Sequence, residues 1–238
     1  MAFRIASIGV GAIGGTLAGF MSKEGEDVLL IDSWKDHVDA MNNRGLTLDG
    51  ITGEHKVEVK AIHTDQIPAI EGTFDIVVVA VKSYDTQEAV RRMLPYMRDD
   101  TWVISPQNSI NELRIAPLVG ASRTLGCITT ISAGIYEPAH ITRTGSVSQS
   151  LQKEPLSFKV GELHGEITPR VEKIVDLFSS AGKTVPTQDL WGERGSKMVT
   201  NCFGYATAAL TGMMSHEVRA NKVSRMQILN LAIETIKV

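Results

Sequence analysis

The stretch "IASIGVGAIGG" at residues 5–15 decides the fold, because a short apolar run is followed at once by four glycines. Glycine loses more conformational entropy on folding than any other residue, so such a cluster needs a reason. The apolar run is partly β-branched, as a buried strand should be. After the glycines, Leu17, Phe20 and Met21 recur at helical spacing. The glycines therefore stand between a predicted strand and a predicted helix.

In that context the GxGxxG spacing of Gly9, Gly11 and Gly14 has a mechanism, which is that of a Rossmann-type dinucleotide loop. The first glycine makes the tight turn, the second lets the backbone approach a pyrophosphate, and the third lets helix and strand pack closely. The helix N-terminus faces the anion. We therefore predict that these glycines, with Ala12 and Ile13 between them, bind the cofactor. The alternative is a glycine-rich turn without a ligand.

A second apolar segment, "EDVLLIDSW", predicts a strand that ends on Asp32, 18 residues after Gly14. An acidic residue at about this distance accepts a hydrogen bond from the ribose 2′-hydroxyl, and its charge repels a 2′-phosphate. This favours NAD over NADP, although Ser33 and Lys35 lie near enough to leave NADP open. In the alternative interpretation Asp32 only caps the next turn, where Asp is common.

The composition is that of a soluble globular chain. Its 238 residues carry a formal net charge of −3, without the basic excess that nucleic-acid binding requires. We find no signal-peptide pattern and no apolar run of membrane-spanning length, so we expect a cytoplasmic protein with no membrane partner. Cys127 and Cys202 stand alone, which favours reduced thiols, and the scattered histidines predict no metal site.

Strands and helices alternate along most of the chain, which predicts an α/β fold with a doubly wound, mostly parallel sheet. Apolar runs at residues 74–83 and 101–109 indicate strands, and residues 55–64 alternate as one exposed strand. Residues 183–190 give a last short strand. We therefore expect a Rossmann-type dinucleotide-binding domain at residues 1–189.

Residues 190–238 have an entirely helical pattern and predict a smaller helical domain for substrate binding and homodimer formation. No charged residue occurs between Lys197 and His216, so we expect a buried helix there. From residue 215 onward we expect one final helix. No C-capping residue ends it, so we expect this domain to be incomplete.

Polar residues follow several of the predicted strands, at the edge where ligands of open parallel sheets bind. They are Lys82, then Gln107 and Asn108, then residues 129–132. Each has an ordinary explanation, because polar residues are usual in surface loops. Their convergence on one edge is what supports a site.

Lys197, Asn201 and Tyr205 follow one another at i, i+4 and i+8, which places them on one face of the uncharged helix. A buried ammonium group is costly unless it has a partner. A catalytic role for Lys197 is one explanation of why a lysine occurs at this costly position. A structural ion pair with Glu193 or Asp189 is the other.

The chain resembles the ketopantoate reductase (2-dehydropantoate 2-reductase) family over nearly its whole length. The stretches that carry the resemblance are "GVGAIG", "VKSYDT", "PQNSIN", "TTISAG", "ITRTG" and "KMVTN". The resemblance implies an NAD(P)H-dependent reductase that transfers a hydride to the ketone of a small 2-oxoacid, by a mechanism in which a lysine is the general acid.

The resemblance also implies roles for single residues. Lys82, Asn108 and Ser132 would contact the cofactor, with Asn108 also near the substrate as part of the catalytic machinery. Lys197 would be the general acid, and Asn201 would bind the hydroxy acid.

Some residues depart from the family pattern. Tyr205 and Ser215 stand where the family commonly places substrate-binding Asn residues, and we assign both to the substrate pocket. Ser109 replaces a usual Gly, and "LIDS" replaces a strand end that often carries an NADP-binding Arg. These differences leave the reaction type intact and ketopantoate itself open.

Two other functions stay open at this point. One is a Rossmann module that senses a nicotinamide nucleotide without chemistry and does not require Lys197. The other is a dehydrogenase of a different ketone or alcohol, which Tyr205 keeps open.

Overall fold

The computed structural model describes residues 3–145 and 156–237. The chain divides into two compact units, Met1–Leu190 and Trp191–Val238.

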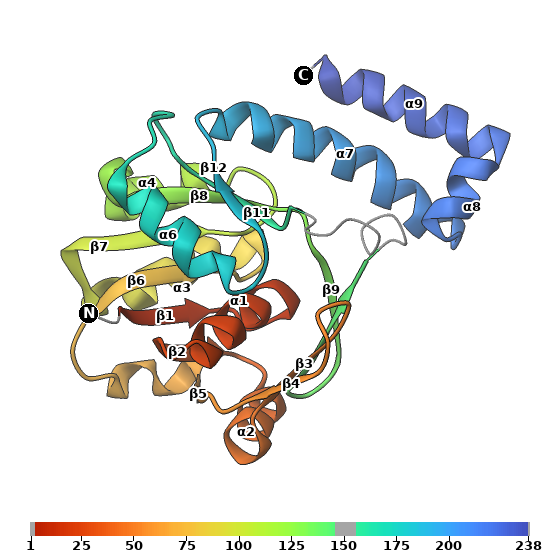
Figure 1. Ribbon diagram of the computed structural model, residues 1–238. Coiled ribbons are helices and arrows are strands. Elements are labelled where there is room, and N and C mark those ends of the chain that lie inside the picture. Colours follow the sequence, from red (N-terminus) through yellow and green to blue (C-terminus); the bar gives the residue numbers. More distant parts are fainter. Residues whose placement is uncertain (1–2, 146–155, 238) are drawn as a thin grey trace. The chain divides into compact units, whose positions relative to one another are not determined.

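An eight-stranded sheet forms the centre of the first unit (Figure 1). Its strand order is β12-β11-β8-β7-β6-β1-β2-β5. Every neighbouring pair is parallel except β8 and β11, so the predicted doubly wound, mostly parallel sheet is confirmed. The strands are β1 (Arg4–Ile8), β2 (Asp27–Asp32), β5 (Lys60–His63), β6 (Phe74–Val79), β7 (Met97–Ser105), β8 (Thr124–Thr129), β11 (Phe158–Glu162) and β12 (Thr184–Pro186).

Helices cover both faces of this sheet (Figure 1). One hydrophobic cluster contains side chains of α1 (Ala12–Lys23), α2 (Lys35–Arg44) and α6 (Pro169–Ser179). The other contains side chains of α3 (Thr86–Met93) and α4 (Glu112–Val119). Successive strand residues point to opposite faces, so each buried strand contributes to both clusters. The described part of this unit also contains four short 3₁₀ helices: η1 (Thr64–Ala69), η2 (Ser83–Asp85), η3 (Leu94–Tyr96) and η4 (Ala121–Arg123).

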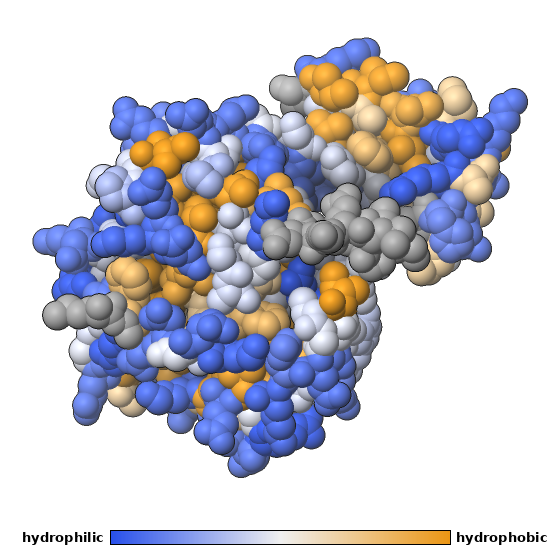
Figure 2. Space-filling view, viewed as in Figure 1, coloured by the Kyte–Doolittle hydropathy of each residue, from blue (hydrophilic) through white to orange (hydrophobic). Residues whose placement is uncertain are grey.

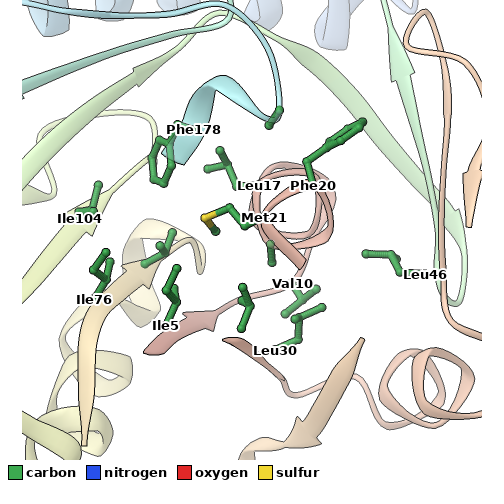
Figure 3. Close-up of a cluster of buried hydrophobic side chains, with 14 of the residues drawn as sticks. Ile5, Val10, Leu17, Phe20, Met21, Leu30, Leu46, Ile76, Ile104 and Phe178 are labelled. Carbon is green, nitrogen blue, oxygen red and sulfur yellow. The ribbon is translucent and has the colours of Figure 1, made fainter. Parts of the chain in front are cut away.

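The core between α1 and the sheet consists of closely packed aliphatic and aromatic side chains (Figure 3). Leu17 and Met21 of α1 are fully buried, together with Ile5, Leu30 and Ile76 from three different strands. Burying one such side chain stabilises the fold by about 1.5–3 kcal/mol. The helical spacing of Leu17 and Met21 in the sequence thus places both side chains on the face of α1 that packs against the core.

A second sheet of four strands packs against α1, in the order β4-β3-β10-β9. Two glycines of α1 make room for it. A β-carbon on Gly15 would lie 2.3 Å from Ile141 Cδ1, and one on Gly19 would lie 2.9 Å from Leu46 Cδ2. The strands are β3 (Leu46–Gly50), β4 (His55–Val57), β9 (Ser132–Glu137) and β10 (His140–Thr144).

The single strand expected at residues 55–64 is wrong. Its first part is β4 in the four-stranded sheet, and its last part is β5 at the edge of the large sheet. Glu58 and Val59 connect the two. Both strands have one buried face, so the alternation of polar and apolar residues does not reveal the change of sheet.

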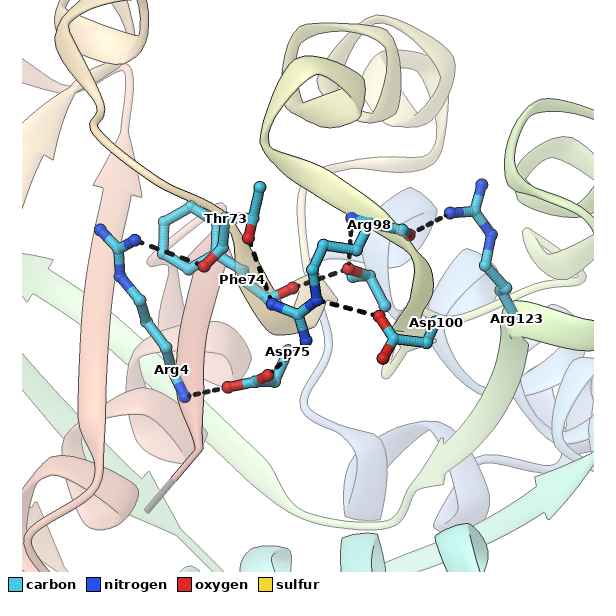
Figure 4. A network of polar contacts seen from close by, with 8 residues as sticks. Arg4, Thr73, Phe74, Asp75, Arg98, Asp100 and Arg123 are labelled. Atoms are coloured by element: carbon cyan, nitrogen blue, oxygen red, sulfur yellow. Dashed lines mark hydrogen bonds and ion pairs between the residues drawn. The ribbon is translucent and has the colours of Figure 1, made fainter. Parts of the chain in front are cut away.

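Charged side chains hold the amino ends of β1, β6 and β7 together (Figure 4). Asp75 of β6 accepts hydrogen bonds from the Arg4 N–H at 2.8 Å and from the Arg98 guanidinium at 2.5 Å. Burial alone would raise the pKa of Asp75, but these two contacts outweigh it and the pKa is lowered. This network lies at the edge of the sheet opposite the carboxyl ends of the strands.

The second unit is helical, with α7 (Leu190–Thr211) followed by α8 (Ser215–Ala220) and α9 (Lys222–Ile236). The expected single helix from residue 215 is divided at Asn221. Its side chain accepts hydrogen bonds from the N–H groups of Val223 and Ser224 at 3.0 and 3.2 Å and so caps α9. In the described segments, no helix is both long and apolar enough to cross a bilayer.

Helix α7 is not the buried helix that its lack of charge predicts. Tyr205 is 69% exposed and Leu210 is 88% exposed. Figure 2 shows hydrophobic side chains gathered on the surface of this unit. An uncharged helix surface predicts that another element covers it, but it does not predict which element. Exposed apolar surface of this kind is typical of interaction surfaces.

Candidate dinucleotide site

The site lies where the strand order of the large sheet reverses. From β1 the chain continues to β2 on one side, and β6 lies on the other side of β1. Ligands of doubly wound sheets bind at such a point, beyond the carboxyl ends of the strands. A pocket of about 450 Å³ occurs there, and Gly9, Gly11, Asp32 and Lys82 are among the residues that line it. The structure thus brings four predicted cofactor residues together.

The three motif glycines occupy different environments. Gly9 has a φ of +90°, and a β-carbon on it would lie 2.5 Å from the Val81 nitrogen. A β-carbon on Gly14 would lie 2.0 Å from the Gly9 oxygen. A β-carbon on Gly11, by contrast, would meet no atom within 4 Å. Packing within the protein requires a glycine at positions 9 and 14. At Gly11 packing leaves open space, and this is where a phosphate must approach.

The first turn of α1 is free to bind an anion. Gly11 is its N-cap residue and provides no side-chain hydrogen bond, and the turn contains no acidic residue. The first N–H groups of a helix lack intrahelical partners and attract negative charge. Ala12 and Ile13 open the helix and are partly exposed. The residues present therefore fit the pyrophosphate of a dinucleotide.

Asp32 fixes the glycine loop from the end of β2. Its Oδ2 accepts a hydrogen bond from the Val10 N–H at 2.7 Å, and its Oδ1 accepts one from the Trp34 N–H at 2.9 Å. The turn-capping bond of the alternative interpretation is therefore present. A carboxylate has about four acceptor positions, so further positions remain for a ribose hydroxyl. That role stays a prediction.

His37 supports the same loop, and the sequence analysis missed it. Its Nδ1 accepts a hydrogen bond from the Ala139 N–H at 2.8 Å, so the ring is neutral and Nε2–H donates to the Val10 oxygen at 2.9 Å. Burial lowers the pKa of His37, and the Val10 bond and the charge of Asp32 oppose this only in part. The partners lie 27 and 102 residues away along the chain, so no local signal identifies His37.

Gln107, which follows β7, ties its own loop to the loop that carries Lys82. Its Nε2 donates hydrogen bonds to the Val81 oxygen at 2.6 Å and to Thr86 Oγ1 at 2.8 Å. Gln107 and Thr86 are both buried. Two of the three polar strand ends predicted to converge are therefore joined by hydrogen bonds.

Asn111 makes a second connection between these loops and was also missed. Its Nδ2 donates hydrogen bonds to Ser83 Oγ at 2.9 Å and to the Asn108 oxygen at 2.7 Å. Between Asn108 and Asn111 in the sequence, Ser109 has a φ of +71°, a conformation that favours glycine. This conformation gives a structural reason for the Gly that the resemblance implies at this position, and the Asn111 contacts hold this loop in place.

Charged residues of both signs line the pocket and bear on cofactor choice. Its described lining contains the acids Asp32, Asp85 and Glu88 and the bases Lys82 and Arg92. Arg92 Nε lies 3.3 Å from Glu88 Oε1, one turn away on α3. The sequence analysis did not single out Arg92, because an i, i+4 ion pair on a helix is ordinary surface chemistry.

The remaining predicted residues lie outside this pocket's lining. Ser132 is the exposed first residue of β9. Lys197 and Asn201 are partly buried on α7, Tyr205 is exposed, and Ser215 begins α8 with its side chain outside the described part. Asn108, after β7, is exposed and also absent from the described lining. The site roles of all six stay predictions. Within residues 3–145 and 156–237, no cluster of three or more His, Cys, Asp or Glu side chains could hold a metal ion.

Residues 5–155 match the family described as Ketopantoate reductase PanE/ApbA. The chain belongs to this family. The 2-dehydropantoate 2-reductase of Pyrococcus horikoshii is 31% identical over 236 residues, which are 98% of this chain and 71% of that protein. The enzyme of the same name from Pyrococcus abyssi is 30% identical over the same shares.

Solved structures agree with this assignment to the ketopantoate reductase family. The crystal structure of 2-dehydropantoate 2-reductase from Geobacter metallireducens has a TM-score of 0.84 and 25% identity, and the match covers 98% of this chain and 74% of that one. D-mandelate dehydrogenase in complex with NADH shares the fold, with a TM-score of 0.81 at 18% identity and coverage of 98% and 72%. The predicted family, fold class and enzyme class, an NAD(P)-dependent oxidoreductase, are confirmed.

The glycine environments predict that the same substitution has a large effect on stability at Gly14 and almost none at Gly11. Gly14→Ala places a methyl group against the Gly9 carbonyl and should lower the free energy of unfolding by roughly 1–3 kcal/mol or more. Gly11→Ala enters open space and should leave it nearly unchanged, while Gly11→Val should fold normally and lose nucleotide binding. Urea denaturation and NADH fluorescence titration measure both effects. Equal stability of the two alanine variants would contradict this packing.

Two histidines predict opposite effects of pH on stability. Burial lowers the pKa of His37 below 6.5, so its contribution to stability is present above about pH 6.5 and is lost as the pH falls. Hydrogen bonds to Glu137 and Asp49 raise the pKa of His140, so its contribution is present below about pH 6.5 and is lost as the pH rises.

The measurement is the free energy of unfolding between pH 5.5 and 7.5 for the wild type, His37→Gln and His140→Gln. From pH 7.5 to 5.5 the advantage of the wild type over His37→Gln should shrink, and its advantage over His140→Gln should grow. A change in the same direction for both variants would contradict the assigned protonation states.

Proposed function

We propose that this chain reduces the ketone of a small 2-oxoacid, with NADH as the preferred cofactor and Lys197 as the general acid. The observation that carries the proposal is the pocket at the β1 and β6 ends, with open space at Gly11 and an uncapped first turn of α1. Membership of a family of ketone reductases supports the reaction type.

Lys197 supplies the acid in this mechanism. Bound NAD(P)H provides a hydride for the ketone carbon, and negative charge develops on the ketone oxygen. The Lys197 ammonium group stabilises that charge and donates the proton, an effect typically worth ~10²–10⁴-fold in rate. Asn201, one turn further along α7, binds the carboxylate or hydroxyl of the substrate. Tyr205 and Ser215 belong to the same substrate pocket.

Lys82, Asn108 and Ser132 act on the cofactor side in this proposal. The hydrogen bonds of Gln107 and Asn111 support it, because they hold the loops of Lys82 and Asn108 in one arrangement before any ligand binds. Preorganised donors need not be reordered during the reaction, which is where much of an enzyme's electrostatic stabilisation originates.

The preference for NADH rests on the charges of the pocket. Its described lining carries three acids and two bases, and one of the bases is paired with Glu88. A 2′-phosphate brings about two negative charges into this environment, whereas a ribose 2′-hydroxyl can donate a hydrogen bond to Asp32.

We also propose that two copies of the chain associate through the helical unit. Its exposed hydrophobic side chains support this, because burial of such surface drives association. They include Leu210, Met214, Val223, Met226, Leu229 and Ile233.

Lys197→Ala should fold normally, retain its affinity for NADH and lose most of kcat, since the lost group acts on charge that develops only in the transition state. Asn201→Ala should mainly raise KM. Lys222→Ala removes an equal charge from the same unit and serves as the matched control. Oxidation of NADH at 340 nm with a panel of 2-oxoacids measures turnover, and the melting temperature is measured on the same preparation.

Two outcomes would overturn the assignment of Lys197. Turnover of Lys197→Ala near the wild-type rate would end its catalytic role. A lower melting temperature, with activity loss that only follows instability, would favour a structural ion pair instead. NADH binding by the wild type without turnover of any ketone would favour a sensor.

Asp32→Ala should narrow the preference for NADH over NADPH about tenfold or more, because both the hydroxyl acceptor and the repelling charge are lost. Asp85→Ala removes an equal charge from the same pocket and should change the ratio of the two dissociation constants much less. Fluorescence titration with both nucleotides measures that ratio. Tighter binding of NADPH by the wild type would reject the assignment.

A further inference from the structure

A second pocket, of about 500 Å³, lies in the first unit between the four-stranded sheet and the turn that follows α6. We call it the Arg143 pocket. Its lining includes Thr52, Arg143, Ser157, Gly182 and Lys183, and it shares no described lining residue with the dinucleotide pocket. The proposed reaction does not use it, and the family resemblance, although its stretch "ITRTG" contains Arg143, assigns this residue no role.

Arg143 is a buried cation without a described counter-ion. It is 5% exposed and lies on the same face of β10 as the core residue Ile141. Its Nη1 donates a hydrogen bond to the Ala181 oxygen at 2.7 Å, while its Nε is buried with no hydrogen-bond partner. Burial lowers the pKa of Arg143, and no carboxylate of the described residues opposes this effect. A buried charge in this state is costly unless an anion binds it.

Thr52 provides an independent observation in the same pocket. It lies in the turn between β3 and β4, and its Oγ1 is buried with no hydrogen-bond partner. A buried hydroxyl without a partner carries a desolvation cost of about 1–3 kcal/mol. The Arg143 Nε and the Thr52 hydroxyl can both donate, so the two unsatisfied groups call for the same kind of ligand, an acceptor.

The charges of the lining narrow the class of acceptor. Lys183 adds a second cation, and no Asp or Glu occurs among the described residues that line the pocket. A phosphate group carries about −1.5 to −2 charges at neutral pH and offers several strong acceptor oxygens. Arginine favours such groups, because its planar guanidinium matches their geometry.

We propose that the Arg143 pocket binds a phosphate group, free or as a monoester, through Arg143 Nε and the Thr52 hydroxyl, with Lys183 supplying further positive charge. This site is separate from the dinucleotide pocket and does not depend on the reductase activity.

The test is isothermal titration of the whole chain with inorganic phosphate, against chloride at equal ionic strength. The wild type should bind phosphate saturably, and Arg143→Met should weaken this binding at least tenfold. Arg92→Met removes the same charge from the dinucleotide pocket and should leave it unchanged. Glycerol 3-phosphate in a second arm distinguishes a monoester, which would bind more tightly than phosphate, from free phosphate.

Thermal unfolding supplies a readout that does not depend on binding heat. Phosphate should raise the melting temperature of the wild type and not that of Arg143→Met, because only the form that binds is stabilised. Without phosphate, Arg143→Met should be at least as stable as the wild type, since an aliphatic chain replaces an unpaired buried charge. Should Arg143→Met fail to fold, Thr52→Val decides, because it keeps the shape and loses the donor, and it should bind phosphate several-fold more weakly.

The proposal is overturned if phosphate has no more effect than chloride on the wild type, or if Arg143→Met and Thr52→Val both bind phosphate as tightly as the wild type. It is also overturned if Arg92→Met loses the binding and Arg143→Met keeps it, since the phosphate then occupies the dinucleotide pocket.

Discussion

The chain after β1 lies so close to the chain after β6 that Gly9 has no room for a β-carbon, and α1 packs so closely against both that Gly14 has none either; the rest of the site depends on this approach. On its other side the helix meets the four-stranded sheet, where Gly15 and Gly19 lie close to the side chains of Ile141 and Leu46. The glycines of the first turn therefore serve two contacts, one with each sheet. Their combined effect is to hold the uncapped helix N-terminus at the point where the strand order reverses.

Polar contacts between distant segments then fix the loops around that N-terminus. Asp32 and His37 bind the two backbone groups of Val10, and Gln107 and Asn111 join the two loops that follow β6 and β7. Each of these side chains connects backbone segments that are not neighbours in sequence. Removal of one partner leaves a buried group unsatisfied, at a cost of about 1–3 kcal/mol, so such networks favour a single arrangement of the site.

The sequence predicts well what depends on neighbouring residues. The strand, glycine loop and helix at residues 5–23 and the position of Asp32 at a strand end follow from local spacing, and the structure contains them. The four-stranded sheet does not follow in this way, because β3 and β10 pair across a long stretch of chain. For the same reason the sequence does not reveal the contacts of His37, Asn111 and Arg143, since their partners are set by tertiary packing.

Helix α7 shows a different limit of sequence reasoning. Its uncharged stretch correctly marks a surface without charge, but burial also requires a covering element, which a helix's own composition does not specify. Tyr205 and Leu210 are accordingly exposed in the helical unit.

The central claim is that a nicotinamide dinucleotide binds at the N-terminus of α1, and amide chemical shifts test it most directly. Isotope-labelled protein titrated with NADH should show its largest backbone amide shifts at residues 9–13 and 80–82, with saturation at one equivalent. Saturable binding that leaves the amides of Gly11, Ala12 and Ile13 unshifted would contradict the account, because the pyrophosphate would then lie away from the open glycine.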